Sequence, residues 1–140
     1  MTYEDLVEKI KKAGGRVTGQ RKIILQQLIK HQNKLQSVDE LLYACQQYNS
    51  AINLTTIYRN LEFLDGLQLI YKTNIDRATS GYKLINLETH HHYMICSSCG
   101  KLLPIEHCPM SDDLIKAAEK EGFTISGHSM EVYGTCQSCS

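Results

Sequence analysis

The sequence predicts an α+β fold, in which helices form the first part of the chain and short strands follow. Three observations support this prediction. Apolar residues recur at helical spacing behind capping residues as far as Gly66. Two β-rich runs, "LIYKTNI" and "GYKLINL", come next. Two Cys-x-x-Cys pairs then lie among alternating strand and helix signals in the last third of the chain.

Four short helices are expected before Gly66, because a capping residue precedes each apolar stripe. The caps are Thr2, Thr18, Ser37 and Asn53. The stripes that would face the core are Leu6, Val7 and Ile10, then Ile24, Leu25, Leu28 and Ile29, then Val38, Leu41, Leu42 and Cys45, and finally Ile57, Leu61 and Leu64. Cys45 lies within its stripe, so we interpret it as a core residue rather than a metal ligand.

The two β-rich runs flank "DRATS" and predict a β-hairpin. Short helices followed by a hairpin are typical of a winged helix-turn-helix domain, whose last helix enters the major groove of DNA. The polar residues that this helix would present to DNA are Thr55, Thr56, Tyr58 and Arg59. The alternative interpretation is an ordinary amphipathic helix with a solvated polar face.

Charge is distributed unevenly, although the formal net charge is zero. Residues 1–88 hold twelve Lys/Arg and nine Asp/Glu, whereas the remainder holds three and six. Eight Lys/Arg and no acid lie between Lys9 and Lys34. Such a segment is either a solvated surface or a phosphate-binding face, and the neighbouring polar helix favours DNA. We expect phosphate contacts from Arg16, Arg21 and Lys22.

The segment after residue 89 predicts a second, α/β domain. "YMIC" and "KLLPIE" are short strand signals, "SDDLIKAAEKEG" is a helix signal, and "FTISGHSMEVYGTC" predicts a further strand region. A domain of this size has little core, so a structural metal would help to stabilise it. The expected division is a winged-helix domain at 1–84, a hinge at 85–89 and a metal-binding domain at 90–140.

The two Cys-x-x-Cys pairs predict one structural zinc site. Each pair directs two thiolates at one point, and two pairs complete the tetrahedral shell that zinc prefers. The predicted ligands are Cys96, Cys99, Cys136 and Cys139. Two separate redox pairs are the alternative, but neither pair lies in the strand-to-helix context of a thioredoxin-type motif.

The histidines next to the first pair are surplus to that site. In a strand, His90 and His92 point to one face and His91 to the other. His128 could join His90 and His92 if its strand region pairs with theirs. Such a cluster predicts a second metal site of nitrogen and oxygen ligands. The carboxylates that could complete it are Glu106, Asp112 and Asp113.

Several other classes of protein are disfavoured. The chain has no apolar run of membrane-spanning length and no signal-peptide core, so we expect a cytoplasmic protein without a membrane partner. A zinc deaminase needs His-x-Glu and Pro-Cys-x-x-Cys, and both are absent. A catalytic zinc on three histidines would lack a separate nucleophile. We therefore expect neither an enzyme nor a small-molecule substrate.

At this point a resemblance is evident. The segments "KAGGRVTGQRKIIL", "TTIYRNLEFLDGLQLI", "HHHYMICSSCGK" and "HSMEVYGTCQSC" resemble the ferric uptake regulator family, over essentially the whole chain. The resemblance implies a metal-dependent repressor that binds operator DNA as a homodimer. It also implies a winged helix, a hinge, and a dimerisation domain with a four-cysteine zinc site.

Within that family, the chain is most similar to the zinc uptake regulators, on "IEHCPM" and "SGHSMEVYGTCQSC". The family's common hinge site is largely missing, because Leu35, Tyr93 and Pro104 stand at its positions. His90, His92 and His128 match the family's other site, in the dimerisation domain. Its usual glutamate falls at Ser111, so the resemblance nominates the adjacent Asp112 as fourth ligand, followed by Glu106 and His91. Cys108 is interpreted either as a buried apolar thiol or as a ligand.

The resulting hypothesis is a zinc-sensing transcriptional repressor with a structural Zn²⁺ and a second divalent metal, expected to be Zn²⁺, in a regulatory site. An iron- or peroxide-responsive regulator of the same family is one alternative. A zinc-ribbon interaction protein or redox switch is another, although it would leave the winged-helix half without a role.

Overall fold

The chain folds into two compact units, residues 1–88 and 89–140. The computed structural model describes residues 2–85, 92–108 and 110–140. Of the predicted hinge, only Ile85 lies within the described residues. No helix in the described part of the chain combines the length and the apolar content needed to cross a bilayer.

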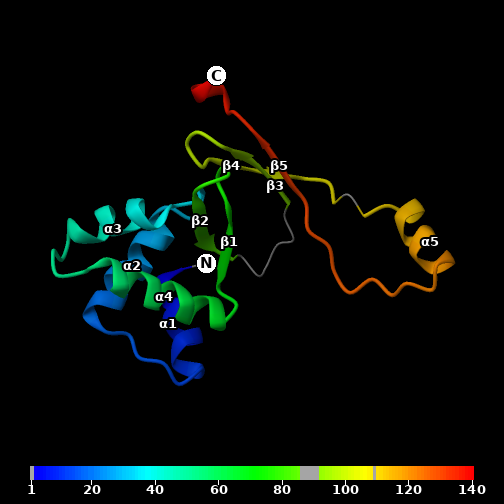
Figure 1. Ribbon diagram of the computed structural model, residues 1–140. Coiled ribbons are helices and arrows are strands. Elements are labelled where there is room, and N and C mark those ends of the chain that lie inside the picture. Colours follow the sequence, from blue (N-terminus) through cyan, green and yellow to red (C-terminus); the bar gives the residue numbers. More distant parts are fainter. Residues whose placement is uncertain (1, 86–91, 109) are drawn as a thin grey trace. The chain divides into compact units, whose positions relative to one another are not determined.

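The first unit consists of four helices and a two-stranded sheet, as the sequence predicts (Figure 1). Its elements are α1 (Tyr3–Lys12), α2 (Gly19–Lys30), α3 (Val38–Gln46), α4 (Leu54–Gly66), β1 (Ile70–Asn74) and β2 (Ser80–Leu84). All four predicted caps are confirmed, since each side chain accepts a hydrogen bond from the backbone N–H three residues on. Thr2 and Asp5 form a reciprocal capping box.

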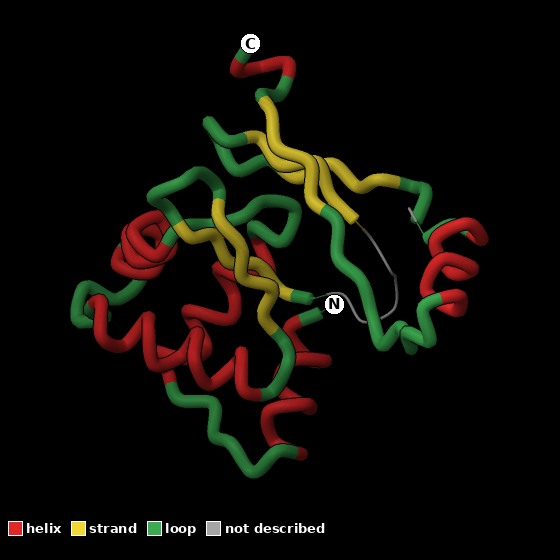
Figure 2. Tube along the Cα trace, turned by 45° about the vertical axis from the view of Figure 1, so that its right-hand side comes forward, coloured by secondary structure: helices red, strands yellow, loops and turns green. Residues whose placement is uncertain are grey.

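The predicted stripes meet in one apolar core. Ile24 and Leu25 of α2 and Ile57 and Leu64 of α4 are fully buried. Cys45 is also fully buried, which confirms its interpretation as a core residue, and this burial raises the pKa of its thiol to about 11. Strands β1 and β2 pair antiparallel, from Ile70 opposite Leu84 to Asn74 opposite Ser80, and α4 precedes them directly (Figure 2). The winged helix-turn-helix prediction is confirmed.

The second unit contains a three-stranded sheet and one longer helix. Its elements are β3 (His92–Cys96), β4 (Leu102–Ile105), α5 (Asp112–Lys120), β5 (Glu131–Gly134) and a 3-10 turn η1 (Gln137–Cys139). The strand order is β4-β3-β5, with β4 antiparallel and β5 parallel to β3. Ser111 caps α5 as expected, and Gly122, with a φ of +67°, ends it.

The predicted strand region 123–136 is mostly wrong. Only Glu131–Gly134 forms a strand, and residues 123–130 have no regular secondary structure. The reason lies in residues 126–129, Ser-Gly-His-Ser, which are poor strand formers next to the β-branched and aromatic residues of β5. The chain therefore reaches β5 through an irregular segment, which carries His128.

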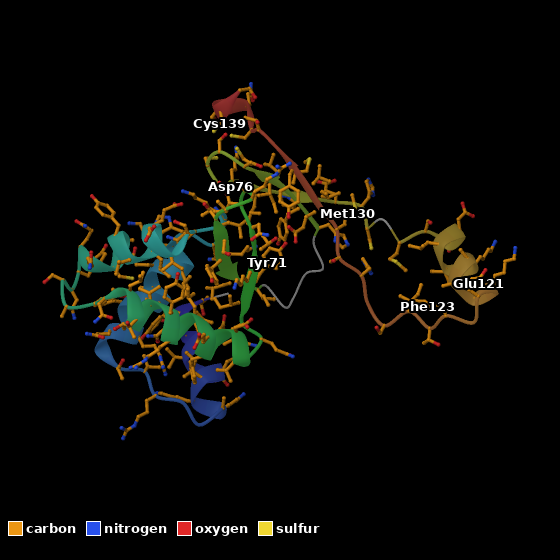
Figure 3. The ribbon with its side chains drawn as sticks, viewed as in Figure 1. Tyr71, Asp76, Glu121, Phe123, Met130 and Cys139 are labelled. Atoms are coloured by element: carbon orange, nitrogen blue, oxygen red, sulfur yellow. The ribbon has the colours of Figure 1, made fainter. Side chains whose placement is uncertain are left out.

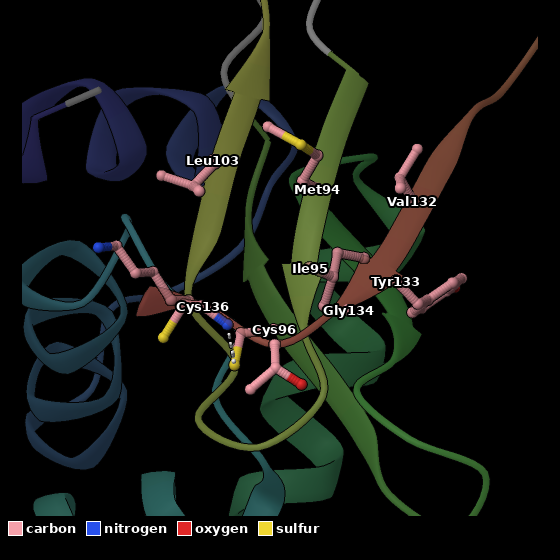
Figure 4. Close-up of a pocket in the computed structure, with 10 residues that line it drawn as sticks. Met94, Ile95, Cys96, Leu103, Val132, Tyr133, Gly134 and Cys136 are labelled. Atoms are coloured by element: carbon pink, nitrogen blue, oxygen red, sulfur yellow. Dashed lines mark hydrogen bonds between the residues drawn. The ribbon is translucent and has the colours of Figure 1, made fainter. Parts of the chain in front are cut away.

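Apolar side chains remain exposed on this second unit. Met94, Leu103 and Val132 lie opposite one another on the three strands, each about 40% exposed (Figure 4). Helix α5 buries no side chain, although it is strongly amphipathic. Phe123 lies just beyond the end of α5, before the chain returns through Met130 to β5, and it is 67% exposed (Figure 3). Apolar faces of this extent indicate a protein interface.

Candidate metal centres and nucleic-acid face

The four predicted zinc ligands lie together at one end of the parallel strands. Cys96 ends β3, and Cys99 lies in the turn that leads to β4. Gly100 closes that turn with a φ of +78° and donates its N–H to the carbonyl oxygen of Cys96 at 2.9 Å. Cys136 follows β5, and Cys139 donates its N–H to the Cys136 carbonyl at 3.0 Å. All four sulfur atoms lie within 4.8 Å of one another.

Hydrogen bonds within the cluster shift the pKa values of Cys96 and Cys139 in opposite directions. The Cys136 N–H lies 3.3 Å from Cys96 Sγ, as Figure 4 shows. This N–H and that of Cys99 lower the pKa of Cys96 to about 6. The neighbouring side chains of Cys136 and Cys99 raise the pKa of Cys139 to about 12. Four thiols this close cannot all ionise without a cation, so the cluster is arranged for a positive ion.

The geometry fits a four-sulfur zinc site. Tetrahedral ligands at a Zn–S distance of ~2.3 Å place sulfur atoms about 3.8 Å apart. The distance between Cys99 Sγ and Cys136 Sγ is 3.8 Å. A tetrahedral site with four protein ligands has no open position for water or substrate, which is typical of a structural metal.

A second cluster of donors consists of His92, Cys108 and His128. His92 Nε2 lies 3.0 Å from His128 Nε2, and Cys108 Sγ lies 3.0 Å from His128 Nε2 and 3.6 Å from His92 Nε2. His92 is buried, whereas the other two side chains are exposed. The cluster is therefore buried on the side of His92 and open to solvent on the side of Cys108 and His128.

The register of the parallel strands explains how His92 and His128 meet. Tyr93 pairs with Glu131 and Cys96 with Gly134, so the residues before both strands lie at the same end. His92 begins β3, and His128 lies three residues before β5. The predicted pairing of these two regions is thus observed, although His128 lies in the irregular segment.

Cys108 joins this cluster from the other edge of the sheet. It follows β4, which pairs with β3 from His92 opposite Ile105. Its interpretation as a buried apolar thiol is wrong, because the side chain is exposed. The segment after β4 leaves the sheet, and no residue in the described part of the chain encloses the Cys108 side chain as a core would. The sequence signal for its role as a ligand is its place in "IEHCPM", one of the segments that resemble the zinc uptake regulators.

None of the other predicted ligands is among the described donors of this cluster. His90 and His91 are outside the described residues. Asp112, in the first turn of α5, and Glu106, just after β4, are exposed and do not belong to the cluster of described donors. Within the described residues, the site therefore offers two imidazole nitrogens and one sulfur. Tetrahedral zinc separates such ligands by roughly 3.3–3.6 Å, close to the observed distances.

The predicted DNA-contacting residues of α4 differ in exposure. Thr55, Tyr58 and Arg59 are exposed. Thr56 is half-buried, and its hydroxyl donates to Asn53 Oδ1 at 3.1 Å, while its backbone carbonyl accepts from Asn60 Nδ2 at 2.8 Å. The exposed surface of α4 is thus carried by the other three side chains.

The predicted phosphate contacts also differ. Arg16 and Lys22 are exposed. Arg21 is half-buried, which lowers the pKa of its guanidinium, and it donates two hydrogen bonds within the protein. Its Nε donates to Asn60 Oδ1 at 2.7 Å, and its Nη1 donates to the Arg16 carbonyl at 2.6 Å.

The chain is similar in sequence to known metal-responsive regulators over nearly its whole length. Residues 12–133 match the model of the ferric uptake regulator family. The ferric uptake regulation protein of Campylobacter upsaliensis is 30% identical over 99% of this chain and 92% of its own length. The peroxide-responsive repressor PerR of Staphylococcus epidermidis is 30% identical over 97% of this chain and 89% of its own.

Solved structures resemble the fold over nearly the whole chain. The ferric uptake regulator of Vibrio cholerae superposes with a TM-score of 0.76 at 26% identity, over 94% of this chain and all of that one. A zinc uptake regulator solved with zinc and DNA superposes with a TM-score of 0.63 at 26% identity, over 99% of this chain and 95% of that one.

Proposed function

This chain belongs to the ferric uptake regulator family, and we propose that the metal it senses is zinc. Proteins of this family are metal-responsive transcription regulators and not enzymes. The match over residues 12–133 includes the winged helix, which a zinc-ribbon interaction or redox-switch protein would not require. The related proteins include iron-named and peroxide-responsive members, so the metal has to be argued from the site.

The observation that supports zinc is the donor set of His92, Cys108 and His128. Thiolate is a soft ligand that favours zinc, whereas carboxylate-rich sites suit harder ions such as Mn²⁺. In the described residues, no carboxylate joins this cluster. We assign it as the regulatory zinc site, with His90 or a nearby carboxylate as fourth ligand. The four-cysteine cluster is assigned as the structural zinc site.

The regulator binds operator DNA as a homodimer. We assign the exposed apolar face of α5 and the sheet to the second copy, because no other described element covers α5. Tyr58 and Arg59 are proposed to work at or near the bases, with Thr55 beside them and Arg16 and Lys22 on phosphates. Two recognition helices of a dimer reach half-sites roughly 34 Å apart, or a multiple of that. Such a protein works where the DNA is, in the cytoplasm.

The regulatory donors come from three separate segments of the chain. His92 begins β3, Cys108 follows β4, and His128 precedes β5. A bound zinc supplies the positive charge that holds a thiolate and two neutral imidazoles together. Zinc then favours the arrangement in which the three segments lie together over an arrangement in which they are apart. DNA affinity can rise only by as much as the zinc affinities of these two arrangements differ. Such couplings are typically ~1–3 kcal/mol, or about 5- to 150-fold.

A double variant, His92→Ala with His128→Ala, tests the proposal. Operator binding is measured against free zinc, on duplex DNA selected from a randomised pool by the zinc-loaded wild type. The variant should keep the cysteine-bound zinc and remain dimeric, but it should no longer gain DNA affinity when zinc is added.

Parallel titrations with Mn²⁺ and Fe²⁺ separate the iron- and peroxide-responsive alternatives. Wild type should reach full DNA affinity at a far lower free concentration of Zn²⁺ than of either other ion. Equal or better activation by Fe²⁺ would remove the zinc assignment and leave family membership intact. A double variant that still needs added zinc to bind DNA would place the sensing site elsewhere.

A further inference from the structure

Arg21 connects two parts of the winged-helix unit that lie far apart in sequence. From the first turn of α2 it reaches Asn60 in the middle of α4, with an Nε–Oδ1 distance of 2.7 Å. It also reaches back to the Arg16 carbonyl oxygen, at 2.6 Å. Its guanidinium carbon lies 4.0 Å from the centre of the Phe63 ring, also in α4. One side chain thus contacts both α4 and the loop before α2.

The Asn60 side chain is buried, and both ends of its amide are hydrogen-bonded within the protein. It is 7% exposed, and its side-chain amide donates to the Thr56 carbonyl at 2.8 Å while its oxygen accepts from Arg21. It therefore cannot reach DNA itself. Yet it lies one residue after Arg59, on the helix that presents Tyr58 and Arg59. The Arg21–Asn60 hydrogen bond attaches α2 to the inner side of the recognition helix.

The loop at residues 13–18 is held against α4 by a second contact. A Cβ on Gly15 would lie 2.7 Å from Cζ of Phe63, so only glycine allows this approach. Gly14, with a φ of +82°, ends α1, and the Gly15 N–H donates to the Ile10 carbonyl at 2.9 Å. Arg16 follows directly, with an exposed side chain and a backbone carbonyl bound by Arg21.

We propose that Arg21 is a positioning residue for DNA binding: it fixes the loop that carries Arg16 relative to the recognition helix α4, instead of contacting a phosphate as a free cation. Charge-assisted hydrogen bonds of this kind add geometric specificity as well as energy. Arg16 and the α4 side chains then meet the DNA backbone and bases in one fixed spacing. This inference rests on the proposed DNA-binding role of that face.

The test uses charge as its discriminator. Arg21→Lys keeps the positive charge but loses the planar fork that bonds Asn60 and Arg16 together. Asn60→Ala removes an uncharged, buried partner. Lys22→Ala is the matched control, since Lys22 is an exposed cation next to Arg21 on the same helix. Binding to the selected duplex is measured for zinc-loaded dimers over a range of salt concentrations, and unfolding curves show that each variant is folded.

A positioning role makes Arg21→Lys and Asn60→Ala each weaken DNA binding by about tenfold or more. Their double variant should be little weaker than the worse single variant, because both changes break one connection. Lys22→Ala should also weaken binding, but with a salt dependence flatter by about 0.9 in the log–log slope for one lost phosphate contact, whereas Arg21→Lys and Asn60→Ala should keep the wild-type slope. An Arg21→Lys protein that binds as tightly as wild type would overturn the inference, because charge alone would then suffice.

A second measurement does not depend on DNA. Amide hydrogen exchange in the loop at residues 15–18 should become at least several-fold faster in Arg21→Lys, with exchange in the core of α2 unchanged. Unchanged loop exchange would also overturn the inference. If wild type selects no duplex at all while the loop still loosens, the DNA-binding proposal fails and the structural role of Arg21 stands.

Discussion

The most informative single substitution is Cys108→Ser, because it tests which atoms define the regulatory site. Cys108 Sγ lies 3.0 Å from His128 Nε2 and 3.6 Å from His92 Nε2, so it is one of three described donors. Serine is close in size but holds its proton at neutral pH and is a poor zinc ligand. The side chain is exposed, so the substitution creates no cavity in the core.

The expected loss follows from the number of donors. Changing a residue that only supports a ligand typically costs 10–100-fold in metal affinity, so removal of a ligand should cost about 100-fold or more. That factor corresponds to ~2.8 kcal/mol. At a free zinc concentration ten times the wild-type Kd, occupancy would fall from about 90% to about 10%. Most of the zinc-induced gain in DNA affinity should disappear with it.

The assay is competition for zinc with a chromophoric chelator, together with titration of Co²⁺ as a spectroscopic probe. The weaker of the two sites should lose its zinc affinity in Cys108→Ser, and its thiolate-to-cobalt absorption should vanish. Asp112→Asn and Glu106→Gln are the comparison variants, because both carboxylates are exposed and outside the described cluster; loss of affinity in one of them beside the loss in Cys108→Ser would identify the fourth ligand. Wild-type affinity in Cys108→Ser, with loss in Asp112→Asn, would refute the thiolate assignment and restore a nitrogen–carboxylate site.

Three further predictions address the other parts of the molecule. Cys96→Ser should lose one zinc per chain and weaken the regulatory site while the winged-helix unit stays folded; full metal content by elemental analysis would contradict this. Arg16→Ala should reduce the salt-dependence slope of DNA binding by about 0.9, whereas Arg59→Ala should also change the ranking of duplex sequences, by ~1–3 kcal/mol per base contacted. The Cys45 thiol ionises at a lower pH in the unfolded chain than in the folded protein, where burial raises its pKa to about 11. As pH rises from about 9 to about 11, the wild-type free energy of unfolding should therefore fall more steeply than that of Cys45→Ala, by roughly 1.4 kcal/mol per pH unit. Urea titrations of both proteins across this pH range would measure the difference.

The winged-helix unit could be predicted from sequence because its signals are local. A cap and an apolar stripe lie within one helix, as with Ser37 and Leu41, and both can be recognised without knowing what packs against them. The hairpin is equally local, since Asp76 accepts backbone N–H groups from Ala78 and Thr79 within the turn. Such features keep their meaning in any tertiary context.

The four-cysteine cluster could also be predicted from the sequence, because in each half two residues separate the two cysteines. The regulatory cluster could be predicted only in part. Strand alternation could nominate His92, and the pairing hypothesis could add His128. Cys108 has no partner at a characteristic spacing, and its distance to His128 depends on how two irregular segments leave the sheet. The contacts of Arg21 could not be predicted for the same reason, since Asn60 is 39 residues away.

The two metal clusters are not independent features of the second unit, because the same pair of strands carries both. His92 and Cys96 are the first and last residues of β3, so the clusters lie about 13 Å apart along it. His128 and Cys136 flank β5, which pairs in parallel with β3. Zinc bound by Cys96 and Cys136, as proposed, would fix the register of the two strands at one end. A slip of one residue would move every side chain of β5 to the opposite face of the sheet and would separate His128 from His92 at the other end. On the proposed assignment, the four-sulfur site therefore does more than stabilise a small domain with few buried apolar residues: it would hold in place His92 and His128, two of the proposed donors to the regulatory metal.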